Sequence, residues 1–411
     1  MMRCGLLGEK LGHSYSPAIH AQLADYAYGL YEVAPEALPA FLTGGDFDAL
    51  NVTIPYKKAV IPYCTELSPI ARRLGSVNVL VRRPDGTLYG DNADAFGFEY
   101  LVRHSGIDVA GQKALVLGNG GASATIQAVL EQLGAHVTVI SRHGPDNYEN
   151  LDRHADAHVI VNTTPVGMYP NNGAAAVDLT AFPACAGVLD LIYNPRRTAL
   201  LLQAEELGIP CSDGLPMLVA QAKAAEEHFF DRPIADRENE HILAQLRREM
   251  TNLVLIGMPG SGKSAVGAAL AALTGREAID IDARIAEKAG CSIPKIFAKG
   301  GEAAFRALER EVTAACGALS GKLLLTGGGV VKTPENYAAL HQNGRIYQLL
   351  RPLELLPTDG RPLSQGADLA AMWAERAPLY ERFRDAAIDN SGTVEQTAQA
   401  IWRDFCENSG H

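Results

Sequence analysis

The chain has 411 residues, of which 47% are hydrophobic and 20% charged, and its formal net charge is −11 at pH 7. At about 150 residues per domain this length predicts two or three domains, and the apolar fraction excludes a wholly disordered chain. The acidic balance argues against a nucleic-acid or membrane partner, because both surfaces recruit clusters of basic residues.

The first hundred residues alternate short apolar runs with a helical stretch. Residues 3–8, 49–54 and 77–82 are predicted strands, and Ser16-Pro17 starts a helix predicted over residues 16–28. This alternation is typical of an α/β fold.

Two residues of this region have the chemistry of a proton donor and its partner. Lys57 closes the segment NVTIPYK, and Asp94 lies in GDNADAFGF. A lysine hydrogen-bonded to a carboxylate is suited to hand a proton to a developing alkoxide. Taken alone, each residue is more typical of a solvated surface.

The middle third predicts a parallel sheet covered by helices on both faces. Its strands are rich in Val, Ile and Leu, and we expect them at residues 113–117, 136–140, 158–161 and 188–192. A helix is predicted over residues 122–133.

The first of these strands leads into a glycine-rich turn that is suited to seat a pyrophosphate. The turn consists of Gly118, Asn119, Gly120, Gly121, Ala122 and Ser123. The next strand ends at Arg142 with no acid to hold a ribose hydroxyl, and a cation there suits a 2′-phosphate. The pattern therefore favours NADP over NAD, and a plain surface arginine is the other interpretation.

The charged stretch 231–250 carries a weak apolar stripe, which predicts a capping helix and a linker. A new buried strand begins at Thr251, so we expect a second α/β unit from there to the C-terminus.

Cysteine usage is sparse and lacks a C-x-x-C pair, and the chain shows neither a signal peptide nor an apolar run of about 18 residues. These features predict a cytoplasmic protein.

The strand near residue 253 runs into GMPGSGKS, residues 257–264, and then into an alanine-rich helix. This strand–loop–helix context is the one that a phosphate-binding loop requires. Backbone N–H groups, the helix start and Lys263 supply positive charge, and Ser264 has the hydroxyl that ligates Mg²⁺.

Two carboxylates follow the next strand, at Asp280 and Asp282. One of them is suited to hold Mg²⁺ and the other to orient an acceptor hydroxyl. The alternative is that this segment only caps the following helix. Arg306 lies on a predicted helix, where an arginine is usually solvated, and the glycine run 327–329 allows a ligand to approach closely.

Residues 251–402 resemble the shikimate kinase family, through motifs that occur in the family order: GxxxxGKS, DxD at 280–282, GExxFR at 301–306, TGGG at 326–329, RPL at 361–363 and RxPLY at 376–380. The resemblance implies that ATP is the phosphate donor and shikimate the acceptor. The implied shikimate contacts are Asp282, Arg306, Gly328 and Arg376. The implied nucleotide contacts are Gly260, Ser261, Gly262, Lys263, Ser264, Ala265 and, from a closing lid, Arg361. Lys263, Asp282 and Arg361 are the implied catalytic residues, and Ser264 and Asp280 the implied Mg²⁺ ligands.

Residues 3 to about 248 resemble the shikimate dehydrogenase family, through GEKLGHSYSPAIH, NVTIPYK, GSVN, GDNADAFGF, GNGGAS, NTTPVGM and DGLPMLVAQA. The resemblance implies that Lys57 transfers the proton and that Asp94 is its partner. The implied substrate contacts are Ser14, Ser16, Thr53, Asn78, Tyr193 and Gln221. The implied NADP contacts are Gly118 to Ser123, Arg142 and Gly214. The second basic residue of the family's NADP clasp is replaced by Asp146.

Together the resemblances imply a dehydrogenase-like region at 1–248 and a kinase-like region at 251–411. In the first, residues 1–96 and 215–248 form the substrate part and residues 97–214 a Rossmann-like NADP part. The implied function is NADPH-dependent reduction of 3-dehydroshikimate followed by ATP-dependent phosphorylation of shikimate.

Two alternatives stay open at this stage. In one, the kinase-like half binds nucleotide without catalysis, because Pro357 replaces an arginine of the family's lid and the lid is short. In the other, the dehydrogenase acts on a relative such as quinate with NAD.

Overall fold

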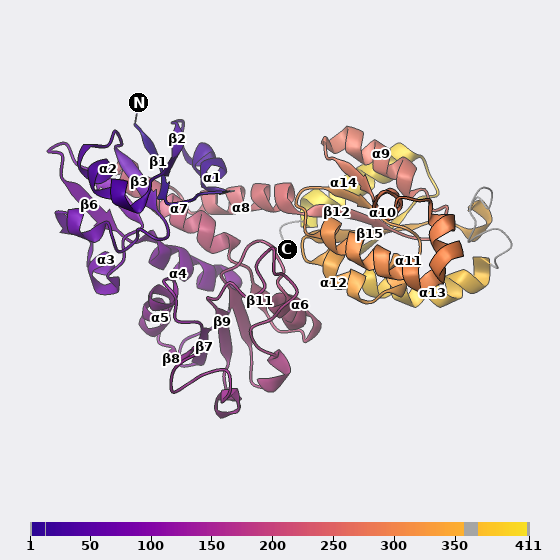
Figure 1. The fold of residues 1–411 in the computed structure, drawn as a ribbon, viewed down its shortest axis with the longest axis horizontal. Coiled ribbons are helices and arrows are strands. Elements are labelled where there is room, and N and C mark those ends of the chain that lie inside the picture. The colour runs from indigo at the N-terminus through magenta and orange to yellow at the C-terminus, as the bar shows by residue number, and fades with distance from the viewer. Residues whose placement is uncertain (1, 13, 357–368, 409–411) are drawn as a thin grey trace. The chain divides into compact units, whose positions relative to one another are not determined.

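The computed structural model describes residues 2–12, 14–356 and 369–408 (Figure 1). They form an α/β protein with three sheets, which confirms the predicted fold class. The chain splits into two compact units between Leu243 and Ala244. No helix of the described residues is long and apolar enough to cross a membrane. Two positions singled out in the sequence, Pro357 and Arg361, lie outside the described residues.

The first sheet of the N-terminal unit has six strands in the order β2-β1-β3-β5-β6-β4. Its strands are β1 (Cys4–Gly8), β2 (Tyr28–Glu32), β3 (Ala49–Val52), β4 (Glu66–Leu67), β5 (Val79–Arg82) and β6 (Leu88–Asp91). Strand β5 is antiparallel to both β3 and β6, and the other pairs are parallel. The helices of this part are α1 (Ser16–Leu23), α2 (Leu38–Gly44) and α3 (Pro69–Leu74).

The helix predicted over residues 16–28 was too long. Helix α1 ends at Leu23, because Ala24 takes an extended conformation. Tyr28 then begins strand β2, in register with Cys4 of β1. The closely spaced tyrosines of this segment suit a strand better than a helix, since aromatic side chains fit a pleated, half-buried surface.

The second sheet is entirely parallel and has the order β11-β10-β9-β7-β8. Its strands are β7 (Lys113–Leu117), β8 (His136–Ile140), β9 (Val159–Asn162), β10 (Gly187–Asp190) and β11 (Cys211–Ser212). Buried clusters lie on both faces of it, one with α4 (Ala93–Ser105) and α5 (Ser123–Gln132), the other with α6 (Ala199–Glu206). The predicted parallel sheet with two covered faces is therefore confirmed.

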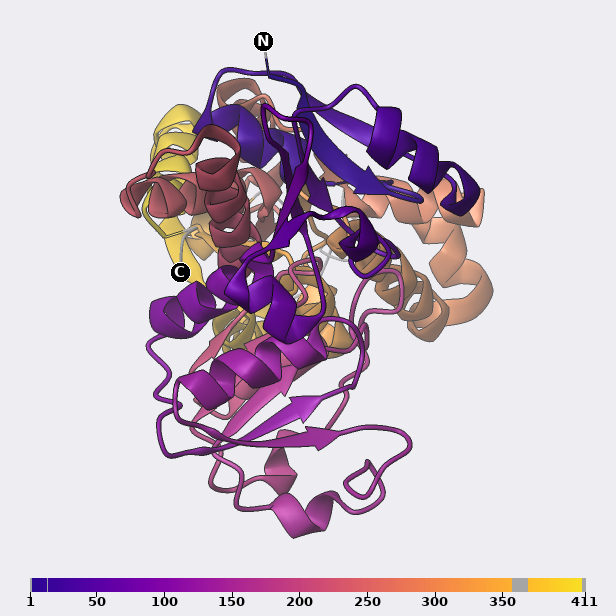
Figure 2. The ribbon, with the colours of Figure 1, turned by 90° about the vertical axis from the view of Figure 1, so that its left-hand side faces the viewer.

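Helix α7 (Leu215–Phe230) returns the chain to the first sheet. Its buried residues Ala224, Ala225 and Phe229 pack with Cys4 and Ala49. Figures 1 and 2 show the two sheets of this unit in separate lobes, with α4 and α7 between them. Helix α8 (Arg237–Met250) follows, so part of the charged stretch is helical as predicted.

Helices α4 and α7 approach closely at a glycine. A Cβ atom on Gly97 would lie 2.7 Å from the carbonyl oxygen of Met217 and 2.9 Å from Cβ of Gln221. No side chain fits in that space, so only glycine permits this approach. The contact brings Gln221 beside the first turn of α4, which carries Asp94.

The C-terminal unit has a parallel sheet with the order β13-β14-β12-β15-β16. Its strands are β12 (Asn252–Ile256), β13 (Ala278–Asp280), β14 (Leu323–Leu325), β15 (Gly344–Leu350) and β16 (Ala386–Asp389). Its helices are α9 (Lys263–Thr274), α10 (Ile281–Ala289), α11 (Ile293–Gly317), α12 (Glu335–His341), α13 (Leu369–Phe383) and α14 (Val394–Asn408). Two apolar clusters cover the two faces of this sheet.

Candidate active sites

A cavity of about 270 Å³ in the N-terminal unit gathers side chains from both lobes. Most of the predicted contacts of this unit line it: Ser14, Ser16, Thr53, Lys57, Asn78, Asp94, Ala122, Tyr193, Gly214 and Gln221. These residues come from segments far apart in the sequence. The cavity lies at the carboxyl ends of the parallel strands, where α/β folds bind their ligands.

Lys57 and Asp94 form an ion pair in this cavity. Nζ of Lys57 donates to Oδ2 of Asp94 at 2.6 Å, and the two side chains are 28% and 15% exposed. The carboxylate is placed by Asn92, whose side chain accepts from the backbone N–H of Asp94 and so caps α4. The lysine backbone is held to the neighbouring segment, because Val77 N–H donates to the carbonyl of Lys57 at 2.8 Å. The backbone of Lys57 and that of Asp94 are thus each held in place by a hydrogen bond to a neighbouring segment.

Asn51 lines the same cavity but was missed in the sequence analysis. Its Oδ1 accepts from the hydroxyl of Tyr28 at 2.7 Å, and its buried Nδ2 has no partner among the described residues. Successive side chains of a strand alternate between faces, so Asn51 and Thr53 share one. Because Thr53 was a predicted contact, this alternation along Asn51-Val52-Thr53 would have indicated Asn51 as a second one.

A buried polar cluster ties α1 to α7. Nδ1 of His20 lies 3.1 Å from Oε2 of Glu226, and the hydroxyl of Tyr26 donates to the same carboxylate. Burial lowers the pKa of His20, so the ring is neutral at pH 7. Helix α1 begins at Ser16 and α7 carries Gln221. The cluster therefore holds two walls of the cavity in register.

The glycine-rich turn follows β7, at the edge where β8 also ends. Gly118 N–H donates to the carbonyl of Ile140 at 2.8 Å, so the exposed Arg142 leaves β8 beside this turn. A Cβ built on Gly120 or Gly121 would meet no atom of the other described residues within 4 Å, the chain neighbours left aside. This open backbone fits the diphosphate of a dinucleotide. Arg142 does not line the cavity, and its contact with a cofactor stays a prediction.

Two other side chains of this region are turned into the protein. The hydroxyl of Ser123, predicted to contact the cofactor, donates to the carbonyl of Gly118 at 2.7 Å and so shapes the turn. Oδ1 of Asp146 lies 2.9 Å from Nε2 of the buried His154. The carboxylate that replaces a basic residue is thus partly engaged by an imidazole.

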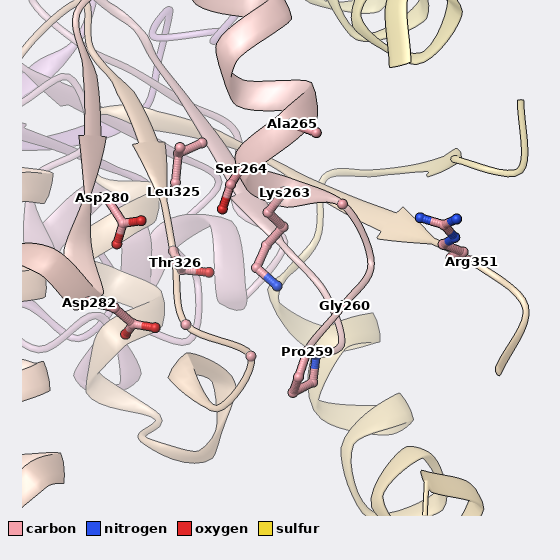
Figure 3. A pocket seen from close by; sticks show the side chains of 13 residues that line it. Pro259, Gly260, Lys263, Ser264, Ala265, Asp280, Asp282, Leu325, Thr326 and Arg351 are labelled. Atoms are coloured by element: carbon pink, nitrogen blue, oxygen red, sulfur yellow. The ribbon is translucent and has the colours of Figure 1, made fainter. Parts of the chain in front are cut away.

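A second cavity, of about 510 Å³, lies in the C-terminal unit (Figure 3). The predicted residues that line it are Gly260, Gly262, Lys263, Ser264, Ala265, Asp280, Asp282 and Gly328. Pro259, Leu325, Thr326 and Arg351 line it as well, without a contact predicted for them, and so does Gly327 of the glycine run. Ser261 is buried and lies outside the lining.

The loop 257–262 and the start of α9 have the features of a phosphate-binding loop. Nζ of Lys263 donates to the carbonyls of Gly257 and Met258, at 2.8 and 3.0 Å. Helix α9 begins at Lys263, so its unsatisfied N–H groups point at the cavity. An anion bound here meets the ammonium and the positive end of the helix together.

The two carboxylates facing this loop differ in their bonding. Oδ1 of Asp280 accepts from Ala283 N–H at 3.0 Å, so Asp280 caps α10 as well as lining the cavity. Oδ1 of Asp282 is buried and has no hydrogen-bond partner in the described part of the chain. Burial, and then the charge of Asp280, raise the pKa of Asp282. A buried acceptor without a partner fits a ligand hydroxyl that donates to it.

Arg306 and Arg376 contact the backbone of the glycine run 327–329 and do not line the cavity. Nη1 of Arg306 donates to the carbonyl of Gly329 and to Glu309, so this arginine is not a solvated one. Nη1 of Arg376 donates to the carbonyl of Gly328, and its buried Nε has no partner among the described residues. Their contact with a substrate carboxylate stays a prediction.

Ser264 and Asp280 offer oxygen donors of the kind Mg²⁺ prefers. Figure 3 shows the Ser264 hydroxyl and the Asp280 carboxylate on the same side of the loop. Asp282, whose Oδ1 lacks a partner among residues 2–12, 14–356 and 369–408, lines the same cavity. The residues present therefore fit a hard divalent cation next to a phosphate.

Two family models match the chain. The model for the shikimate dehydrogenase substrate binding domain matches residues 6–80, and the shikimate kinase model matches residues 259–405. A shikimate dehydrogenase (NADP(+)) of Symbiobacterium thermophilum is 35% identical over 261 residues, which cover 56% of this chain and 88% of that protein.

Solved structures are similar to the N-terminal part of the chain. A chorismate mutase/shikimate 5-dehydrogenase fusion protein from Clostridium acetobutylicum is 34% identical, with a TM-score of 0.57, over 60% of this chain and 97% of its own. Shikimate 5-dehydrogenase of Thermus thermophilus, in complex with NADP(H) and shikimate, is 31% identical, with a TM-score of 0.54. That match covers 59% of this chain and 98% of the other.

Proposed function

The chain belongs to the shikimate dehydrogenase family, and a shikimate kinase domain follows the dehydrogenase region in its sequence. We propose that it performs two consecutive reactions on one ring acid. The first is reduction of 3-dehydroshikimate to shikimate with NADPH. The second is transfer of the γ-phosphoryl group of ATP to the 3-hydroxyl of shikimate. The observation that carries the proposal is the pair of cavities, one with the Lys57–Asp94 ion pair and one with a phosphate loop opposite Asp282.

In the reductase cavity the nicotinamide would supply a hydride to the ketone carbon. Lys57 then gives a proton from its ammonium to the ketone oxygen as negative charge develops there. Asp94 holds the ammonium at 2.6 Å and stabilises its charged form until the transfer. The hydroxyls of Ser14 and Ser16 are proposed to bind the carboxylate of the substrate and so orient the ring.

In the kinase cavity the transferred group would lie between Lys263 and Asp282. Asp282 accepts a hydrogen bond from the attacking hydroxyl and orients it, because its buried Oδ1 has no other partner among the described residues. Lys263 offsets charge on the phosphates. Mg²⁺, held by Ser264 and Asp280, would supply further charge neutralisation there. Arg361, which lies outside the described residues, is proposed to contact the nucleotide phosphates as well.

Replacing Arg142 with alanine is expected to raise the KM for NADP(H) much more than the KM for NAD(H). The guanidinium would pair with the 2′-phosphate, which only NADP carries. Steady-state kinetics with both cofactors measures this, and Arg103→Ala, at an exposed arginine of α4, is the control. Equal shifts for the two cofactors would contradict the assignment.

Replacing Gly328 with alanine is expected to lower kinase kcat/KM by about tenfold or more. The new Cβ would lie 2.6 Å from Cδ and 2.9 Å from the backbone nitrogen of Pro259, so the phosphate loop must shift. A coupled assay for ADP release measures the loss. Reductase activity of the same variant is the internal control, and unchanged phosphorylation would show that the loop position is not critical.

One incubation tests both halves of the proposal. The full chain is mixed with 3-dehydroshikimate, NADPH, ATP and Mg²⁺, and the products are followed by mass spectrometry. We expect shikimate first and shikimate 3-phosphate second. Shikimate without the phosphate ester would favour the alternative in which the kinase domain binds nucleotide only. A parallel incubation with quinate and NAD tests the other alternative.

A further inference from the structure

A cationic side chain that no motif includes lines the kinase cavity. Arg351 follows β15 directly, and it lines the cavity together with Gly262 and Lys263. Strand β15 is parallel to β12, which leads into the phosphate loop. Parallel neighbours end at the same edge of a sheet, so the fold delivers Arg351 and the loop to one place.

Gly262 lets the guanidinium face the loop. A Cβ atom on Gly262 would lie 3.9 Å from Nη1 of Arg351 and only 2.5 Å from Nδ2 of Asn390. That amide cannot retreat easily, because it is buried and donates to the carbonyl of Ser261 at 2.6 Å. Residue 262 also has a φ of 97°, in the region that favours glycine. The side of the loop toward Arg351 therefore stays bare backbone.

The guanidinium of Arg351 is not bound by another group of the described residues. None of the hydrogen bonds, ion pairs or ring contacts found within residues 2–12, 14–356 and 369–408 involves it. Arg306 and Arg376, in contrast, are held by carboxylate or carbonyl oxygens. An exposed guanidinium that lacks a partner in the described part of the chain has its donors available for a bidentate contact with phosphate oxygens.

Arg351 lies away from the side where the acceptor is proposed to bind. Figure 3 shows Arg351 across the phosphate loop from the carboxylates of Asp280 and Asp282. In loops of this kind the backbone N–H groups hold the α- and β-phosphates, while the lysine reaches the β- and γ-phosphates. A group beside Gly262 and remote from Asp282 is thus placed for the first two phosphates.

We propose that Arg351 binds the α- or β-phosphate of the nucleotide in the kinase cavity. This inference rests on the proposed kinase function. It makes Arg351 a determinant of nucleotide affinity that acts on ADP as much as on ATP. It gives the residue no part in orienting shikimate.

The test is direct nucleotide binding by the full chain, measured by isothermal titration calorimetry with Mg·ADP and Mg·ATP in the absence of shikimate. Arg351→Gln is expected to weaken both nucleotides by about tenfold or more, which is typical of a lost hydrogen bond to a charged group. Arg351→Lys should restore part of the affinity, because it keeps the charge. The difference from wild type should shrink at high salt. Arg403→Ala, at an exposed arginine of α14 outside the cavity lining, is the matched control and should bind like wild type.

Each other outcome is informative. Wild-type affinity in Arg351→Gln would overturn the proposal, and so would a loss confined to ATP, which would place the contact at the γ-phosphate. A loss that Arg351→Lys does not relieve and that salt does not change would indicate stacking on the base, and would overturn it too. A wild-type chain that binds neither nucleotide would instead overturn the proposed kinase function. Reductase activity of each variant reports that the chain is folded.

Discussion

Lys57→Ala is expected to slow the reduction of 3-dehydroshikimate by about 10²-fold or more and to leave phosphorylation of shikimate unchanged. The substitution removes the only proposed proton donor and leaves the Asp94 carboxylate without its partner at 2.6 Å. Developing charge on the alkoxide would then have no nearby acid to neutralise it. The rate is measured from NADPH absorbance with 3-dehydroshikimate, and ADP release with shikimate is measured on the same preparation.

The neighbouring residue provides a matched control for this experiment. Lys58 is exposed, lies on the same turn and does not line the cavity. Lys58→Ala should therefore reduce substrate like the wild type. If Lys57→Ala also retained wild-type reduction, Lys57 would have no part in proton transfer. A similar loss in both variants would point to disruption of the turn instead.

Lys263→Ala is expected to produce the reverse pattern, with phosphorylation lowered by about 10²-fold or more and reduction intact. The ammonium contributes a full positive charge beside the start of α9, and it is held by the carbonyls of Gly257 and Met258. Without it the loop loses both a cation and an internal tether. Shikimate-dependent ADP release measures the effect.

Lys288→Ala is the control for the second variant. Lys288 is an exposed residue of α10 that pairs with Glu311 and does not line the cavity. Loss of that surface ion pair should cost little. Shikimate phosphorylation that survived Lys263→Ala would refute the proposed role of the phosphate loop. Loss of both activities in the variant would indicate a general folding defect.

Local patterns predicted much of this fold and of its cavities. Runs of Val, Ile and Leu predicted buried strands such as β7 and β12. The loop 257–264 followed from glycine spacing, because the backbone geometry of a phosphate cradle demands those residues. Asp282 was found because two carboxylates, two positions apart, stand where the predicted strand ends and can both face the phosphate loop.

What local patterns missed depends on contacts between distant residues. His20 and Glu226 meet across 206 positions, and neither residue alone indicates a buried pair. Arg351 belongs to no motif, and its place beside the phosphate loop follows only from the pairing of β15 with β12. The helix predicted over residues 16–28 was too long at its end, where Tyr28 pairs with Cys4 of β1 as part of a strand.

The late return of α7 has a consequence for how a nascent chain reaches its native state. The core around Cys4, Ala49 and Val79 is completed by Ala224, Ala225 and Phe229, which the ribosome adds well over one hundred residues later. The intervening parallel sheet contains all its own strands and emerges complete before them. During synthesis the amino-terminal lobe must therefore wait with apolar surface uncovered while the lobe after it folds, and chaperones that shield such surfaces would act in that interval.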